Sequence, residues 1–147
     1  MGGFFAISFG GNLQGTAKAF DLAIRDLLGN GNLRLTGSSR TVRTAPWEVV
    51  APAFLNRVVT GYARIGAPGL WALLVRTERR KRLRGKGKNW PRTLDLDFLI
   101  FEGPLSWRRD LVLPHPRLSG RPELLSLLGE SKRRRGDFRG LRGRSGG

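Results

Sequence analysis

Two aspartates one residue apart are the strongest chemical signal in the sequence. Asp95 and Asp97 lie in the apolar run 94–101, which ends before Gly103 and Pro104. Such a run predicts a buried strand, in which residues i and i+2 share a face about 7 Å apart. Two carboxylates that close repel each other and are costly to bury unless a cation or a proton compensates them. The pair therefore indicates either a hard metal ion such as Mg²⁺ or a strand end whose aspartates point to water.

The positive charge of the chain is confined to two segments. The net charge is +16, and residues 76–92 carry nine Lys or Arg against one acid, while residues 131–147 carry seven against one. The remaining residues hold eleven bases and nine acids, so most of the chain is nearly neutral. This clustering indicates a polyanionic partner for at least the first segment.

Composition excludes several classes of site. The chain has no cysteine and a single histidine, His115, which excludes disulfides, thiolate metal sites, cysteine nucleophiles and multi-histidine metal sites. The sequence has no run of 18 apolar residues and no positively charged start typical of a signal peptide. We therefore expect a cytoplasmic protein without a membrane partner, and we favour a monomer.

Apolar periodicity and glycine positions predict the elements that must position these residues. Strands are expected at 4–9, 33–43, 54–64 and 94–101, helices at 16–28 and 70–80, loops at 44–53 and 81–90, a short strand at 111–113, and a short helix or irregular segment at 122–128. The main order, β-α-β-β-α-β, predicts a ferredoxin-like α+β sandwich with an antiparallel sheet and both helices on one face. We expect one domain at 1–130 and a disordered basic Gly/Arg-rich tail at 131–147.

Several short motifs occur in one collinear order over residues 4–128. They are Phe9-Gly-Gly-Asn-Leu13, Ser38-Ser39, Thr44-Ala-Pro46, Phe54-Leu-Asn56, Pro91-Arg-Thr-Leu-Asp-Leu-Asp97 and Pro114-His-Pro-Arg-Leu118 with Arg121. This pattern resembles the 6-hydroxymethyl-7,8-dihydropterin pyrophosphokinase family of folate biosynthesis. The resemblance implies a ferredoxin-like fold and magnesium-dependent transfer of pyrophosphate from ATP to the pterin hydroxymethyl group, releasing AMP.

The resemblance also implies roles at the phosphate end of the site. Asp95 and Asp97 match the family's metal ligands and would hold two Mg²⁺ ions, and Asp97 would also orient the hydroxyl or accept its proton. The side chains expected to bind ATP are those of Arg82, Arg84, Arg92, His115 and Arg121, because guanidinium groups suit phosphate oxygens. We expect Asp97, Arg92, Arg82 and His115 to be the catalytic residues. The alternatives are a solvated basic loop for the arginines and a structural turn for the histidine.

The pterin end of the site rests on a second strand. Phe54 matches the family's stacking aromatic and Asn56 its reader of the base edge, and their i, i+2 spacing points both side chains at one pocket. Residues Thr44 and Trp47 bound a segment expected to supply backbone contacts to the pterin. The alternative is a core phenylalanine followed by an asparagine at a strand end.

The chain departs from the family pattern at identifiable positions. Glu123 stands where the family has a second stacking aromatic, and a carboxylate does not stack like a ring. Lys81 stands where a glycine is expected after Glu78, which matches a contact to the ATP ribose. A local shift in register, help from Trp47, or weak pterin binding would each accommodate Glu123.

Three functions are compatible with these features. The first is an active pterin pyrophosphokinase with ATP and hydroxymethyl-dihydropterin as substrates. The second is a degenerate homologue that binds ATP and turns over pterin weakly. The third is a basic nucleic-acid-binding protein of ferredoxin-like fold, with nucleic acid bound through the basic tail only.

Overall fold

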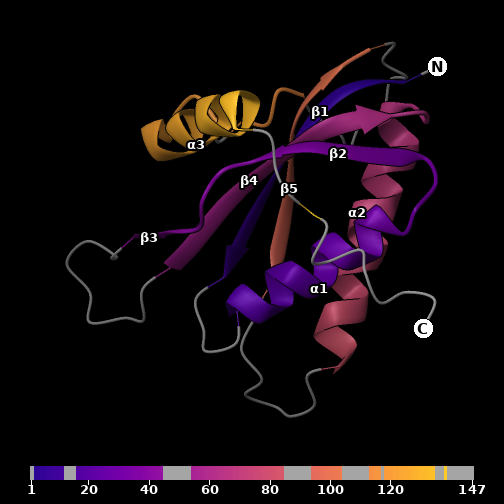
Figure 1. Cartoon of the computed structure of the whole chain (residues 1–147), viewed down its shortest axis with the longest axis horizontal. Helices are drawn as coiled ribbons and strands as arrows, with labels where there is room; N and C mark the ends of the chain where they lie inside the picture. The colour runs from indigo at the N-terminus through magenta and orange to yellow at the C-terminus, as the bar shows by residue number, and fades with distance from the viewer. Residues whose placement is uncertain are drawn as a thin grey trace.

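The computed structural model describes residues 2–11, 16–44, 54–84, 94–103, 113–116, 118–134 and 138, without the side chains of residues 44 and 81–84. The elements, shown in Figure 1, are β1 (Gly3–Gly11), α1 (Thr16–Leu28), β2 (Leu33–Ser38), β3 (Val42–Thr44), β4 (Phe54–Ala63), α2 (Ala67–Arg84), β5 (Asp95–Glu102) and α3 (Pro122–Arg133). Among these residues, no helix is both long and apolar enough to cross a membrane.

The strands form one antiparallel sheet in the order β2-β4-β1-β5. The short strand β3 pairs with the first residues of β4, on the same side of β4 as β2. Helices α1 and α2 contact each other on one side of the sheet, whereas α3 lies on the other side (Figure 1). Apart from β3 and α3, this is the predicted ferredoxin-like α+β arrangement, which is confirmed.

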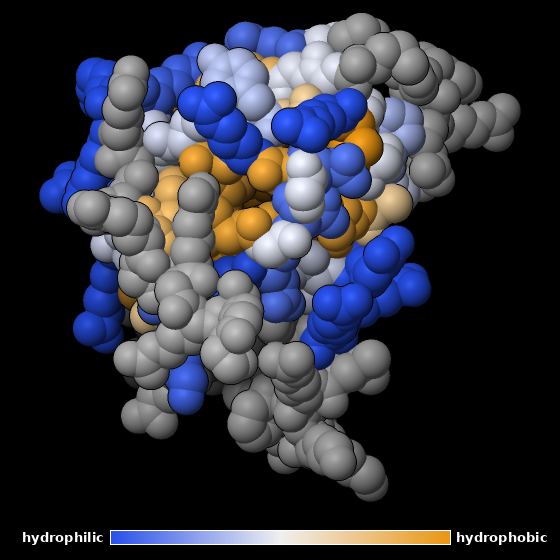
Figure 2. Space-filling model, turned by 45° about the vertical axis from the view of Figure 1, so that its right-hand side comes forward, coloured by the Kyte–Doolittle hydropathy of each residue, from blue (hydrophilic) through white to orange (hydrophobic). Residues whose placement is uncertain are grey.

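Alternation along the strands gives each face its own core. On β1, Phe5, Ile7 and Phe9 belong to the core that α1 and α2 cover, while Ala6 belongs to the core under α3. This follows from the two-residue period of a strand. Figure 2, in which the side of Figure 1 that carries α2 comes forward, shows apolar surface at the centre of the view with hydrophilic side chains around it.

Strand β5 contains a bulge where it passes under α3. Residues Ala6 and Ile7 of β1 pair with Ile100 and Phe98, so Leu99 has no partner in the β1 ladder. The extra residue places Leu99 and Ile100 together on the α3 side, where both contact the core under α3. Bulges of this kind redirect side chains near functional sites.

Several predicted boundaries were wrong. Helix α2 takes in residues 81–84, which were expected to be a loop, and the strand expected at 33–43 is split between β2 and β3. The division into a domain at 1–130 and a tail at 131–147 stays a prediction, although α3 runs past residue 130 to Arg133 and Phe138 is buried. Of the loop predicted at 44–53, Thr44 belongs to β3, and residues 45–53 lie outside the described residues, as does most of the strand predicted at 111–113.

The C-terminal end of α3 is fixed to the β2 edge of the sheet. The amide of Ser38 donates to the carbonyl of Arg134 at 3.2 Å, and the Thr60 hydroxyl donates to the carbonyl of Ser131 at 3.4 Å. The Arg40 amide donates to Oε1 of Glu130 at 3.0 Å. These contacts hold α3 across the middle of one face of the sheet. Helix α3 does not cover the two ends of that face.

Candidate active site

Three adjacent strands bring the predicted metal and pterin residues onto one surface. In the sheet register, Gly10 of β1 is the direct partner of Asp95 on β5 and of Asn56 on β4. Because neighbouring strands lie about 4.8 Å apart, the backbones of Asp95 and Asn56 are about 10 Å apart. Residues separated by 39 positions in the chain therefore flank one floor on the side of the sheet that carries α3.

Among the described residues, the floor between them is left accessible because its central residue is glycine. A Cβ placed on Gly10 would lie 3.6 Å from Oδ1 of Asn56 and 4.0 Å from the carbonyl of Leu55, both ordinary contacts. Apart from Gly10 itself and its two chain neighbours, no other described atom lies within 4 Å of that position. A flat ligand can therefore approach the backbone of β1 here, as glycine in a strand commonly permits.

The two aspartates are half-buried on this face. Asp97, the β5 partner of Ser8, lies beside His115, whose Nε2 is 3.7 Å from Oδ1 of Asp97. That separation is too long for a direct hydrogen bond. The carboxylate and the imidazole are nevertheless neighbours, and both side chains are partly exposed to solvent.

The donor set suits Mg²⁺. Within the described part of the chain, no group of three or more His, Cys, Asp or Glu is arranged to hold a metal on its own. Mg²⁺ in phosphoryl-transfer enzymes is commonly bound by one or two carboxylates, with water and substrate phosphates supplying the remaining ligands. Asp95 and Asp97, on one face of β5 and half-buried, match that requirement.

The β5 bulge positions His115. The amide of His115 donates to the carbonyl of Leu99 at 2.8 Å, so the bulged residue anchors the histidine beside Asp97. The carbonyl of His115 accepts from the Leu118 amide at 3.0 Å, and the carbonyl of Leu118 accepts from the Arg121 amide at 3.3 Å. Successive turns thus link His115 to the start of α3.

Arg121 and Glu123 form an ion pair at the first turn of α3. Nε of Arg121 donates to Oε1 of Glu123 at 2.6 Å. This hydrogen bond holds the pKa of the Glu123 carboxyl below its ordinary value. The carboxylate at the position of the expected stacking aromatic is therefore bonded to a predicted ATP-binding arginine.

Glu78 has a contact that sequence reasoning did not predict. Its Oε2, on α2, accepts a hydrogen bond from the amide of Leu96 at 3.3 Å. Leu96 lies between Asp95 and Asp97, and β5 is an edge strand of the sheet. Glu78, whose family counterpart contacts the ribose but whose own motif is broken at Lys81, thus holds the backbone that carries both aspartates. Its position as the only acid in the basic segment 76–92 was the available signal.

The remaining predicted residues are only partly placed. Phe54 is 40% exposed at the start of β4, so it is not the core phenylalanine of the alternative interpretation, whereas Asn56 is buried. Thr44 ends β3 as the partner of Phe54. Residues Trp47 and Arg92 lie outside the described residues. Residues 82 and 84 lie in the last turn of α2, and their side chains are not described.

Comparison with known proteins identifies the same family as the motifs. The model of the 7,8-dihydro-6-hydroxymethylpterin-pyrophosphokinase family matches residues 6–131. A mitochondrial folate synthesis bifunctional protein of Arabidopsis thaliana is 35% identical over 124 residues, which are 83% of this chain and 22% of that protein.

Single-function relatives are covered more completely. The 2-amino-4-hydroxy-6-hydroxymethyldihydropteridine pyrophosphokinase of Methylorubrum extorquens is 29% identical over 84% of this chain and 79% of its own length. The Synechocystis protein of the same name is 28% identical over 84% of this chain and 64% of its own. The chain spans only about a quarter of the bifunctional relatives. Because the family model covers most of its residues, this chain belongs to the 7,8-dihydro-6-hydroxymethylpterin-pyrophosphokinase family.

Proposed function

We propose that this protein transfers pyrophosphate from ATP to 6-hydroxymethyl-7,8-dihydropterin and releases AMP, in folate synthesis. The observation that carries the proposal is the row formed by Asp95, Gly10 and Asn56 across three strands, with His115 beside Asp97. The row provides carboxylates at one end, an open floor in the middle and an amide at the other end. Those are the requirements for holding a polyphosphate next to a flat heterocycle.

The reaction needs positioning more than covalent help. The hydroxymethyl oxygen attacks the β-phosphorus of ATP, and the bond from that phosphorus to the oxygen bridging to the α-phosphorus breaks. AMP leaves with the bridging oxygen, and the hydroxyl proton passes to a base. Asp97 is our candidate to orient that hydroxyl or accept its proton, because it is half-buried at the edge of the open floor.

Asp95 and Asp97 would hold the Mg²⁺, for which we expect two ions. Bound Mg²⁺ neutralises charge on the phosphates and on the leaving group. The hydrogen bond from the Leu96 amide to Glu78 fixes the strand between the two carboxylates. The protein's own contribution is thus a rigid β5 on which both ligands keep their spacing.

His115 and Arg121 would face the triphosphate, together with Arg82, Arg84 and Arg92. The ion pair with Glu123 engages Nε of Arg121, and a guanidinium carries further donors on its two terminal nitrogens. Arg121 can therefore keep Glu123 and still present a planar edge to a phosphate. In this view Glu123 orients an ATP-binding arginine.

Phe54 would stack on one face of the pterin, since its ring is exposed, and Asn56 would bond the pterin edge over Gly10. The opposite face of the pterin would need a group other than Glu123. Trp47 is the candidate within the segment expected to approach the pterin. The cytoplasmic location stays a prediction, because some relatives are named mitochondrial.

The test is direct. The purified chain is incubated with ATP, Mg²⁺ and hydroxymethyl-dihydropterin, and AMP is measured by chromatography, with pterin omitted in one control and EDTA added in another. We expect AMP to form only in the complete mixture. AMP absent from the complete mixture would overturn the proposal.

The affinity for pterin distinguishes the active enzyme from a degenerate homologue that binds ATP and turns over pterin weakly. Glu123 is the observation that favours it, because a bonded carboxylate replaces a stacking ring. Titration of a fluorescent pterin into the protein with a non-hydrolysable ATP analogue measures that affinity. Binding near the substrate concentrations usual for enzymes, up to about 1 mM, supports the active enzyme. No saturation in that range, with ATP still bound, would support the degenerate homologue.

A further inference from the structure

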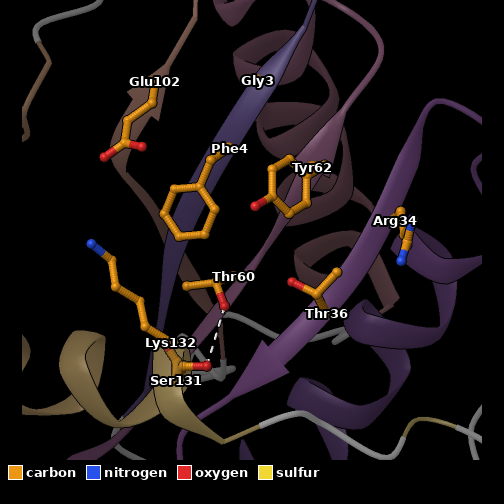
Figure 3. A pocket seen from close by; sticks show the side chains of 9 residues that line it. All are labelled: Gly3, Phe4, Arg34, Thr36, Thr60, Tyr62, Glu102, Ser131 and Lys132. Carbon is orange, nitrogen blue, oxygen red and sulfur yellow. Dashed lines mark hydrogen bonds between the residues drawn. The ribbon is translucent and has the colours of Figure 1, made fainter.

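The face that carries α3 is also open at the end opposite the candidate active site. An open groove of about 750 Å³ lies there, lined by residues of four strands and of the last turn of α3. Figure 3 shows Phe4 and Tyr62 side by side on the strands, with Arg34 on one flank and Lys132 and Glu102 on the other. Phe4 is six residues from Gly10 along β1, so the groove and the site lie about 20 Å apart.

An aromatic pair forms the floor of the groove. Phe4 and Tyr62 are direct cross-strand partners, and their ring centroids are 5.6 Å apart at an interplanar angle of 69°. Tyr62 is 53% exposed, unusual for a large aromatic side chain in the middle of a sheet. The core under α3 does not include either ring. The pair therefore offers a π surface that the cores formed by the described residues do not use.

Cations border this aromatic floor. Lys132 Nζ lies 5.4 Å from the centroid of the Phe4 ring, and Arg34 is exposed on β2. Of the described residues that line the groove, Glu102 is the one acid, and a carboxylate can accept hydrogen bonds from the amino groups of a base. The chain as a whole carries a net charge of +16, which attracts polyanions.

We propose that this groove binds single-stranded nucleic acid. A base would stack on Tyr62 and Phe4, and the adjoining phosphates would lie near Arg34 and Lys132. Exposed aromatics on a sheet face, next to basic side chains, are an arrangement by which proteins bind unpaired bases. A duplex keeps its bases stacked inside, so the groove selects single strands. This binding is separate from pyrophosphate transfer and does not depend on it.

The proposal differs from binding through the basic tail, and a truncation separates the two. Removing residues 139–147 deletes three arginines and keeps α3 and the buried Phe138. The probe is a fluorescein-labelled 12-residue oligouridylate, titrated with the full chain and followed by fluorescence anisotropy at several salt concentrations. The matched variants are Tyr62→Ala, which removes the ring, and Tyr62→Phe, which keeps it.

We expect Tyr62→Ala to weaken binding about ten-fold or more and Tyr62→Phe to retain it, because stacking depends on the ring. Arg34→Ala should reduce the slope of log affinity against log salt by about 0.7, the loss of one phosphate contact. A duplex of the same length should bind more weakly than the single strand. Circular dichroism and AMP release should be unchanged in all three variants.

Three outcomes would overturn the proposal. They are equal binding by Tyr62→Ala and the unaltered chain, complete loss of binding in the truncated chain with its sheet face intact, and equal affinity for duplex and single strand. The first two would assign binding to another surface or to the tail. The third would mean attraction to charge alone.

Discussion

The middle and one end of the same sheet face differ in what covers them. Under α3, Ala6 and Val58 pack against helix leucines and are fully buried. Two residues further towards the site on the same strands, Ser8 and Asn56 are also buried. Beyond Ser8 the strand reaches Gly10, where a Cβ would meet only ordinary contacts with the described residues. One face thus changes from core to candidate site within a few residues.

Two glycines, Gly37 and Gly10, show the difference between the covered region and the candidate site. At Gly37, under the end of α3, a Cβ would collide with the carbonyl of Ser131 and with the hydroxyl of Thr60. At Gly10 a Cβ would meet only ordinary contacts among the described atoms. Glycine therefore serves close packing of backbone at one place and access for a ligand at the other. Helix α3 and the candidate active site thus occupy different parts of one face of the sheet.

The largest effect should come from the carboxylate at the open end. Replacing Asp97 with Ala or Asn should lower the rate of AMP release about a thousand-fold or more, because charge in the transition state loses its compensation. Stability should be unchanged or slightly higher, since the mutual repulsion of Asp95 and Asp97 is relieved. AMP release and thermal unfolding measure the two quantities.

Glu102→Ala is the matched control for this prediction. Glu102 ends the same strand at the far end of the face, paired with Phe4. Its removal should leave AMP release within about two-fold, as expected for an exposed surface substitution. Normal turnover in Asp97→Ala would contradict the assignment of Asp97 as a metal ligand. The uncovered end of the sheet face would then no longer be the candidate active site.

The two glycines should respond in opposite ways. Gly10→Val should fold normally, because valine suits a strand, and should lower kcat/KM for the pterin about a hundred-fold by filling the floor. Gly37→Ala should lower the free energy of unfolding by about 1–3 kcal/mol through overpacking and leave the activity of the folded protein intact. Urea unfolding and steady-state kinetics measure both. A stability loss in Gly10→Val together with an activity loss in Gly37→Ala would contradict the roles assigned to the two glycines.

Much of this fold was readable from the sequence. Short runs of apolar, aromatic and β-branched residues predicted β1, β4 and β5 within about two residues of their ends. The extension of α2 through Arg84 was missed because lysine and arginine are common in both exposed helices and loops. The bulge at Leu99 was also missed, since an unbroken apolar run hides a shift of register.

The site was readable where residue type alone carries chemistry. The sequence predicted that Asp95 and Asp97 share one strand and that Phe54 and Asn56 share another, and the structure places these pairs on β5 and β4. Their roles, and that of His115, stay predictions from the resemblance. The bond from Leu96 to Glu78 joins residues 18 positions apart and depends on how α2 packs beside β5. The pair of Arg121 and Glu123 depends on the extended backbone of Arg121 before α3. Such contacts follow from tertiary structure, not from spacing.

A smaller effect should come from the support of the aspartates. Glu78→Ala removes the acceptor for the Leu96 amide, and the loss of alignment should lower kcat/KM about ten-fold and raise the Mg²⁺ concentration needed for half-maximal rate. Glu78→Gln keeps an acceptor oxygen and should restore most of the rate. The two variants are compared by Mg²⁺ titration of AMP release. Equal losses would mean that the charge of Glu78, not its hydrogen bond, is what matters.

The smallest effect should come from the polar contacts that hold the covered region. The hydrogen bond from the Arg40 amide, aided by the charges of Arg40 and Arg134, holds the pKa of Glu130 below its ordinary value of 4.5. A carboxyl with a lowered folded pKa adds stability that is complete above its unfolded pKa and is lost as pH falls through the folded pKa. Glu130→Gln, which keeps an acceptor for the amide, should therefore cost less than about 1 kcal/mol at pH 7.

The pH dependence decides whether the charge of Glu130 is responsible. The difference in unfolding free energy between the unaltered chain and Glu130→Gln should shrink as pH falls from 4.5 through the lower folded pKa, because the carboxyl then becomes neutral as well. Urea unfolding at a series of pH values measures it, with AMP release at pH 7 as the control for the open end. A difference that persists in acid would assign the effect to packing. A loss of AMP release in the folded variant would show that the covered region and the site are coupled.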